Sequence, residues 1–136
     1  MTRLLPVLVV IALVAAACKG SDSASTAPSP TTTTDTFTGT VQVRGTGIHT
    51  FTVAQSGQVA VTLTAAGPPS TIAMGLGIGT PGDAVCGVLP GGSVTTGAGP
   101  TAQLTGIISP GMLCVTVFDV GNQTAAVTYA VTVVHP

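Results

Sequence analysis

Alternation of apolar and polar side chains dominates the chain from Phe37 onward. In four runs every second residue is large and apolar, and these runs are residues 59–63, 72–78, 113–117 and 127–133. A period of two is typical of β-strands, because successive residues of a strand point to opposite faces. Turn-forming residues separate the runs at 55–57, 66–70, 80–83, 90–93, 109–111 and 120–123. The pattern predicts short antiparallel strands and no helix, with 113–117 and 127–133 as central strands.

Each run has one apolar face, and two sheets packed face to face bury such faces. Strands and turns that alternate every eight to twelve residues or so are typical of an all-β sandwich. We therefore expect residues 37–136 to form one all-β domain, an antiparallel two-sheet sandwich of roughly seven or eight strands.

The first seventeen residues have the organisation of a bacterial signal peptide. Arg3 makes the start positive, and an apolar stretch interrupted only by Pro6 follows from Leu4 to Ala17. A helix of about fourteen residues is about 21 Å long, whereas a permanent span must cross roughly 30 Å of hydrocarbon. This length disfavours the alternative of a transmembrane anchor, and residues 1–17 are predicted to be removed on export.

The residues Ala15-Ala16-Ala17-Cys18 resemble the lipobox of bacterial lipoproteins, with Ala15 where leucine is usual. The resemblance implies cleavage before Cys18 and attachment of lipid, such as palmitate, to this cysteine. At about 0.8 kcal/mol per buried methylene, two or three acyl chains anchor a protein stably to a membrane. An ordinary secretory cut after Ala17 is the alternative. The expected location is the cell envelope, and the outer membrane if the cell is Gram-negative.

Residues 18–36 are predicted to be the lipidated cysteine and a disordered linker. After Cys18 the segment is rich in Ser, Thr and Pro and has no large apolar side chain. Such a segment cannot bury enough surface to offset the entropy of ordering itself. As a coil of about eighteen residues it would hold the domain on the order of 25 Å from the membrane.

The three cysteines fit an exported protein in which one is acylated and two are paired. Cys86 and Cys114 are therefore predicted to form a disulfide that closes a loop of roughly thirty residues. A reactive or metal-binding pair is the alternative, and no well-spaced third ligand supports it.

Charged residues make up only 5% of the chain. Once the leader is removed, two cations face four aspartates, which gives 2 − 4 = −2. Binding of a nucleic-acid backbone needs several clustered cations, so no nucleic-acid partner is expected.

No set of side chains in the sequence predicts catalysis, a metal or a cofactor. His49 is expected to begin a strand, and both it and His135 are interpreted as surface residues, neither with an evident acidic neighbour. Asp83, Asp119 and Asn122 lie in predicted turns, where short polar side chains cap backbone amides without any need for calcium. Hydrolysis would need an activated nucleophile with a base and an orienting acid, which no motif here supplies.

The order of strands and turns resembles the bacterial pre-peptidase C-terminal (PPC) domain over nearly the whole of residues 37–136. The most specific element is the turn Pro110-Gly111 before a strand, followed after Asp119-Val-Gly-Asn122 by a last strand that carries Tyr129. The resemblance implies a jelly-roll-like β-sandwich associated with adhesion or substrate targeting. Met112-Leu113 stands where the family often has aromatic residues, and no calcium or ligand site is carried over.

These features together predict a membrane-anchored, non-catalytic lipoprotein, at the surface or in the periplasm, whose sandwich acts as an adhesion or binding module. Its partners would be the membrane, through the lipid on Cys18, and a ligand in the envelope or outside the cell. The alternatives are a structural envelope protein that self-associates through unprotected strand edges, and an accessory domain to a secreted peptidase.

Overall fold

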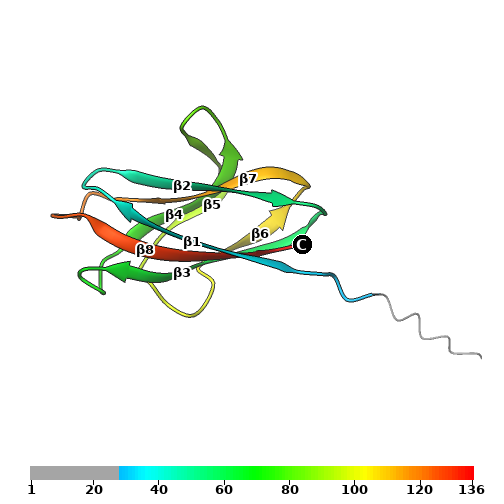
Figure 1. The fold of residues 1–136 in the computed structure, drawn as a ribbon, viewed down its shortest axis with the longest axis horizontal. Coiled ribbons are helices and arrows are strands. Elements are labelled where there is room, and N and C mark those ends of the chain that lie inside the picture. Colours follow the sequence, from blue (N-terminus) through cyan, green and yellow to red (C-terminus); the bar gives the residue numbers. More distant parts are fainter. Residues whose placement is uncertain (1–27) are drawn as a thin grey trace, which may run out of the picture.

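The computed structural model describes residues 28–136, which contain eight strands and no helix (Figure 1). The strands are β1 (Thr33–Val41), β2 (Thr46–Val53), β3 (Gly57–Gly67), β4 (Met74–Pro81), β5 (Cys86–Thr96), β6 (Leu104–Ile108), β7 (Gly111–Phe118) and β8 (Val127–His135). The predicted signal peptide and Cys18 lie outside the described residues. Within residues 28–136 no helix is long and apolar enough to cross a membrane.

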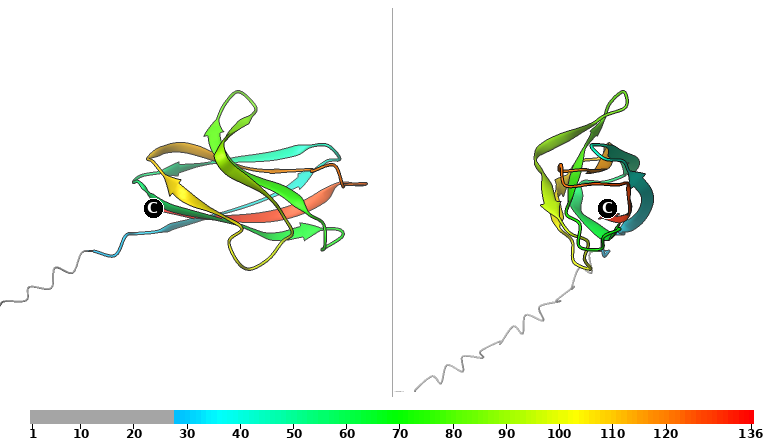
Figure 2. Two further views of the ribbon diagram at one scale, coloured as in Figure 1. Left: turned by 180° about the vertical axis from the view of Figure 1, so that it is seen from behind. Right: turned by 90° about the vertical axis from the view of Figure 1, so that its left-hand side faces the viewer.

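The strands form two antiparallel sheets of four, with orders β1-β8-β3-β6 and β2-β7-β4-β5. The first strand pairs with the last, the second with the last but one, and so on inward: the pairs are β1 with β8, β2 with β7, β3 with β6 and β4 with β5. The chain is thus one long hairpin rolled into two layers, which is the topology of a jelly roll (Figures 1 and 2). The all-β sandwich is confirmed, and so are the two central strands, β7 and β8.

The core lies between the sheets and consists of the alternating apolar side chains. Val59, Val61 and Leu63 of β3 are at most 1% exposed, as are Val131 and Val133 of β8. The predicted polar face of β4 is also covered, because all of its residues from Met74 to Gly79 are buried. Its glycines leave room on the outer face for side chains of neighbouring strands.

Gly75 and Gly77 show this close packing. The Phe118 ring of β7 lies where a side chain at Gly75 would stand, and the Thr116 methyl group occupies the same place at Gly77. Glycine at every second position of β4 therefore lets side chains of the neighbouring strands lie directly over the β4 backbone. Any larger residue at these positions would have to displace one of those side chains.

Two predicted boundaries were wrong. The linker was expected to run to residue 36, yet β1 begins at Thr33, because residues 33–41 form a regular backbone ladder with β8 that needs no apolar side chains. The turn expected at 90–93 lies inside β5. There the pairs Gly77–Ser93 and Gly79–Val88 flank a register shift, so the intervening residues of β5 form a bulge rather than a turn between strands.

Candidate functional site

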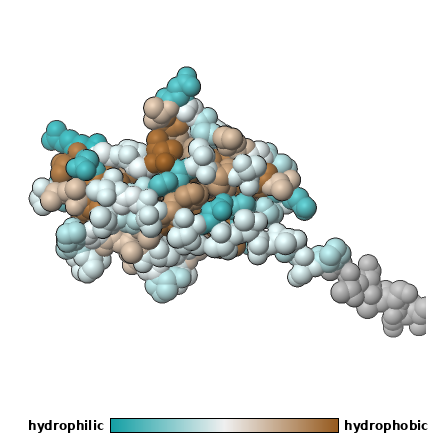
Figure 3. Space-filling model, viewed as in Figure 1, coloured by the Kyte–Doolittle hydropathy of each residue, from teal (hydrophilic) through white to brown (hydrophobic). Residues whose placement is uncertain are grey.

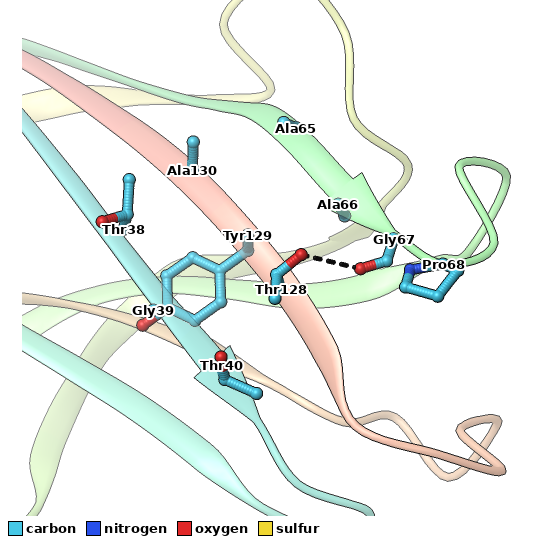
Figure 4. A pocket seen from close by; sticks show the side chains of 10 residues that line it. All are labelled: Thr38, Gly39, Thr40, Ala65, Ala66, Gly67, Pro68, Thr128, Tyr129 and Ala130. Carbon is cyan, nitrogen blue, oxygen red and sulfur yellow. Dashed lines mark hydrogen bonds between the residues drawn. The ribbon is translucent and has the colours of Figure 1, made fainter.

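The candidate site is a hollow of about 680 Å³ on the outer face of the sheet that contains β1, β8 and β3 (Figure 4). Its lining comes from three neighbouring strands and the segment that follows β3. Thr38 and Thr40 border it from β1, Thr128 and Ala130 from β8, and Ala65 from β3. Pro68, directly after β3, forms part of its rim. The hollow exists because every side chain that points outward here is small.

Register explains why threonines gather on this face. The residues at 34, 36, 38 and 40 of β1 are all threonines, and they pair in order with Val134, Thr132, Ala130 and Thr128. Residues directly opposite each other in a ladder point to the same side of the sheet, so all of these side chains stand on the outer face. We call the outward residues of β1 and β8 the threonine face, and the hollow lies at the end around Thr40 and Thr128.

Hydrogen bonds hold part of the threonine face in place. The Thr128 hydroxyl donates to the Gly67 carbonyl at 2.9 Å, the dashed line of Figure 4, and so ties β8 to the end of β3. Thr36 and Thr132 share a bond of 3.4 Å between their hydroxyl oxygens. Within the described residues the Thr38 and Thr40 hydroxyls make no such bond, so both can donate to and accept from a ligand.

The threonine face carries no charge within the described residues. Arg44 lies in the turn between β1 and β2, Asp83 in the turn between β4 and β5, and Asp119 just after β7. Asp35 points to the inner side of β1, because its partner is the core residue Val133. The surface seen in Figure 3 is mostly of intermediate hydropathy, with only a few strongly hydrophilic or hydrophobic spots.

Neither histidine is a surface residue of the expected kind. His49 lies within β2, not at its start, and its Nε2 is 2.7 Å from the Tyr129 hydroxyl oxygen. The His49 ring stacks on Phe37, with 4.8 Å between ring centroids. Burial lowers the pKa of His49 and raises the pKa of Tyr129, because it penalises the charged form of each group.

His135 is only 2% exposed, and it does have an acidic neighbour. Its Nε2 is 3.0 Å from Oδ2 of Asp35, and its ring packs against Phe51. The sequence did contain the information that both histidines face inward. Each lies an even number of positions from the buried apolar residues of its strand, and such residues point to the same face of the sheet. The two histidines share no partner and do not form a common site.

The predicted disulfide is confirmed, since Cys86 and Cys114 are bonded with 5.9 Å between their Cα atoms. It joins the first residue of β5 to β7 across β4, on the outer face of the second sheet. Both sulfurs are consumed in this bond, which leaves neither cysteine free to act as a nucleophile or a metal ligand in this state.

Asp119 caps backbone amides, as its turn position predicted. One carboxylate oxygen accepts from the Arg44 amide at 2.7 Å, and the other accepts from the amides of Gly121, Asn122 and Gln123. These bonds, led by the one from Arg44, hold the pKa of Asp119 below its ordinary value because they favour the charged form. The side chain of Asn122 donates to the Ala73 carbonyl instead.

The Asp119 cap gives a pH-dependent contribution to stability. Its pKa is lower in the folded than in the unfolded chain, so the contribution is full above the unfolded value and is lost as the pH falls through the folded value. We expect Asp119→Asn to be less stable than the wild type at pH 7, and the difference to shrink as the pH falls below the ordinary pKa range of an aspartate. Urea unfolding at several pH values checks this, and a stability difference that does not change with pH would contradict it.

The chain matches no known family model and no curated protein by sequence.

The chemistry that the hollow can perform follows from its lining. The side chains around it are threonine, alanine, proline and glycine, with the tyrosine ring turned to the inner side of the sheet over Gly39. None of the lining residues is an acid, a histidine or a cysteine. Within residues 28–136 no three His, Cys, Asp or Glu side chains are grouped as metal ligands. The arrangement offers hydroxyl groups and methyl groups for binding.

Sequence reasoning missed this site, although part of the signal was present. The alternation of threonine at positions 34, 36, 38 and 40 is plain in the sequence. Thr34 and Thr36 were assigned to the linker, because threonine alone does not distinguish a solvated strand face from a disordered segment. The partners on β8 lie more than eighty residues further on, beyond any local pattern.

Proposed function

We propose that this protein is a membrane-anchored, non-catalytic lipoprotein in which the hollow at the Thr40 end of the threonine face binds an uncharged polysaccharide of the envelope or its surroundings. The anchor is the lipid on Cys18, and residues up to the start of β1 serve as the tether. The observation that carries the binding role is the uncharged hollow of about 680 Å³, in which the Thr38 and Thr40 hydroxyls make no hydrogen bond to the described residues.

The position of the hollow suits a tethered binding module. Strand β1 begins at Thr33, directly after the tether, and the hollow lies at Thr38 and Thr40 toward the other end of the strand. Seven residues of strand at about 3.3 Å each place Thr40 about 23 Å beyond Thr33. In Figure 1 the described residues that precede β1, 28–32, accordingly lie at the opposite end of the sandwich from the far end of β1. A ligand would meet the hollow on the side that faces away from the membrane.

The class of ligand follows from the absence of charge in the hollow. A charged ligand would lose hydration on binding, and no lining residue could pair with its charge. A neutral polymer rich in hydroxyl groups loses less, because threonine hydroxyls both donate and accept hydrogen bonds. The threonine and alanine methyl groups can pack against the C–H faces of sugar rings. A single site of this kind is weak, so adhesion would depend on many copies in one membrane.

One negative charge placed in the hollow is expected to weaken binding strongly. The test incubates the lipidated full chain, in detergent, with the insoluble polysaccharide fraction of envelopes from the producing cell, and measures the protein retained. We expect Thr38→Glu to lower retention at least about tenfold, because the carboxylate would be desolvated without a partner.

Thr34→Glu is the matched control. Thr34 is exposed on the same face of the same strand but does not line the hollow. It should retain wild-type binding. Equal loss in both variants, equal binding in both, or no retention of the wild type above an albumin control would each count against the proposal.

A further inference from the structure

A second hollow lies on the opposite sheet, beneath the turn that joins β4 to β5. It has a volume of about 280 Å³ and lies between this turn and the outer faces of β2 and β7. The turn stands clear of the sandwich in both views of the fold (Figures 1 and 2). The disulfide at Cys86 fixes the base of the turn to β7, and Val85 at its end leans over the hollow.

The walls of this hollow are mainly apolar. Ile48 of β2, Phe118 of β7 and Val88 of β5 line it together with Val85. Val85 is 61% exposed and Val88 is 41% exposed, so two large apolar side chains lie side by side in the lining and remain accessible. No charged residue lines this hollow. The walls therefore suit an apolar and uncharged molecule.

Two threonines also line the hollow: Thr46 is exposed to solvent, whereas the hydroxyl of Thr116 is buried and has no partner within residues 28–136. Thr116 of β7 is 3% exposed, and its hydroxyl oxygen is the one buried side-chain oxygen or nitrogen without a hydrogen-bond partner among the described residues. The Thr116 methyl group packs over Gly77, so the side chain is held by that contact and not by a hydrogen bond. A buried hydroxyl without a partner is destabilising, and valine would fill the same volume without that cost. The unpaired hydroxyl marks a position at which a ligand could supply the missing partner.

We infer that this hollow binds a small, uncharged, apolar molecule that carries a single hydroxyl or carbonyl oxygen. The apolar part contacts Ile48, Val85 and Val88, and the oxygen bonds to the Thr116 hydroxyl. That hydroxyl is covered in the unliganded structure, so binding requires a local rearrangement of the surrounding side chains that uncovers it. This inference does not depend on the threonine face, which lies on the other sheet.

The test uses cyclopentanol and cyclopentane, which differ by one hydroxyl. The protein is the full mature chain with Cys18→Ala, which needs no detergent, labelled with ¹³C at its isoleucine and valine methyl groups. We expect cyclopentanol to shift the methyl signals of Ile48, Val85 and Val88. Thr116→Val should weaken cyclopentanol binding about fivefold, the equivalent of one neutral hydrogen bond, and leave cyclopentane binding unchanged within about twofold.

Two exposed valines give a second pair of variants. Val85→Asp places a charge at the mouth of the hollow and should abolish the binding of both compounds. Val43→Asp, at a 45% exposed position in the turn between β1 and β2, should bind both compounds like the wild type.

Thr116→Val should be at least as stable to urea as the wild type, which would show that its loss of binding is not a loss of folding. The inference is overturned if Thr116→Val binds cyclopentanol as the wild type does, if neither compound shifts these methyl signals, or if Val85→Asp leaves binding intact.

Discussion

Replacement of both disulfide cysteines, in the variant Cys86→Ala/Cys114→Ala, is expected to lower the free energy of unfolding by about 3.5 kcal/mol. The bond links residues 28 positions apart, and opening it restores the freedom of that loop to the unfolded chain. The loop contains β5 and β6, whose partners β4 and β3 belong to different sheets. The disulfide therefore constrains the segment between Cys86 and Cys114, which connects the two layers of the sandwich.

Urea unfolding of the oxidised wild type and of the double variant measures this effect. The reduced wild type serves as a control, because it lacks the bond but keeps both sulfur atoms. It should lose a similar amount of stability, since Cys114 is fully buried and reduction changes little of the packing around it. A loss below about 1 kcal/mol in both would show that the closed loop is not what stabilises this fold.

Gly47→Ala is expected to lower the free energy of unfolding by about 3 kcal/mol. A side chain at Gly47 of β2 would overlap the Tyr129 hydroxyl. Gly39, which pairs with Tyr129 in the other sheet, lies close to the same hydroxyl. The ring would have to move, and its hydrogen bond to His49 would break. Gly106→Ala is the matched control, because nothing lies within 4 Å of a methyl group at that position. It should change stability by less than about 0.5 kcal/mol.

A double-mutant cycle with Tyr129→Phe tests the cause of that loss. Phenylalanine removes the atom nearest to the new methyl group, although the ring carbon Cζ is still only 2.9 Å from the ideal position of that methyl. The combined variant should therefore be destabilised by at least about 1 kcal/mol less than the sum of the single changes. Additive losses would show that the hydroxyl does not cause the destabilisation by Gly47→Ala.

Much of the fold could be predicted because several strands show a clear alternation of apolar and polar residues within their own sequence. The alternation in residues 59–63, 113–117 and 127–133 depends only on neighbours in sequence, and all three runs are strands whose large apolar residues are buried. The disulfide was predictable because the interpretation of Cys18 as a lipidated residue leaves Cys86 and Cys114 as the remaining pair. The cap at Asp119 was predictable because a carboxylate in a turn bonds to the amides that follow it.

The parts that could not be predicted depend on which strands pair and in what register. The threonine face needs β1 and β8 side by side, and neither strand alone distinguishes it from an ordinary solvated surface. The partner of His135 is Asp35, a hundred residues away in sequence. The bulge in β5 contains Pro90 and two glycines, the same residues that favour a turn, so local chemistry could not separate the two.

The proposed function depends most directly on the lipid at Cys18, and mass spectrometry of the N-terminus of the protein purified from bacterial membranes tests for that lipid. We predict a chain that begins at Cys18 and carries the added mass of a diacylglyceryl group on sulfur, with a further acyl chain on the amine where the cell supplies it. An unmodified Cys18, or a chain that keeps residues 1–17, would contradict the anchor and with it the proposal of a tethered binding module.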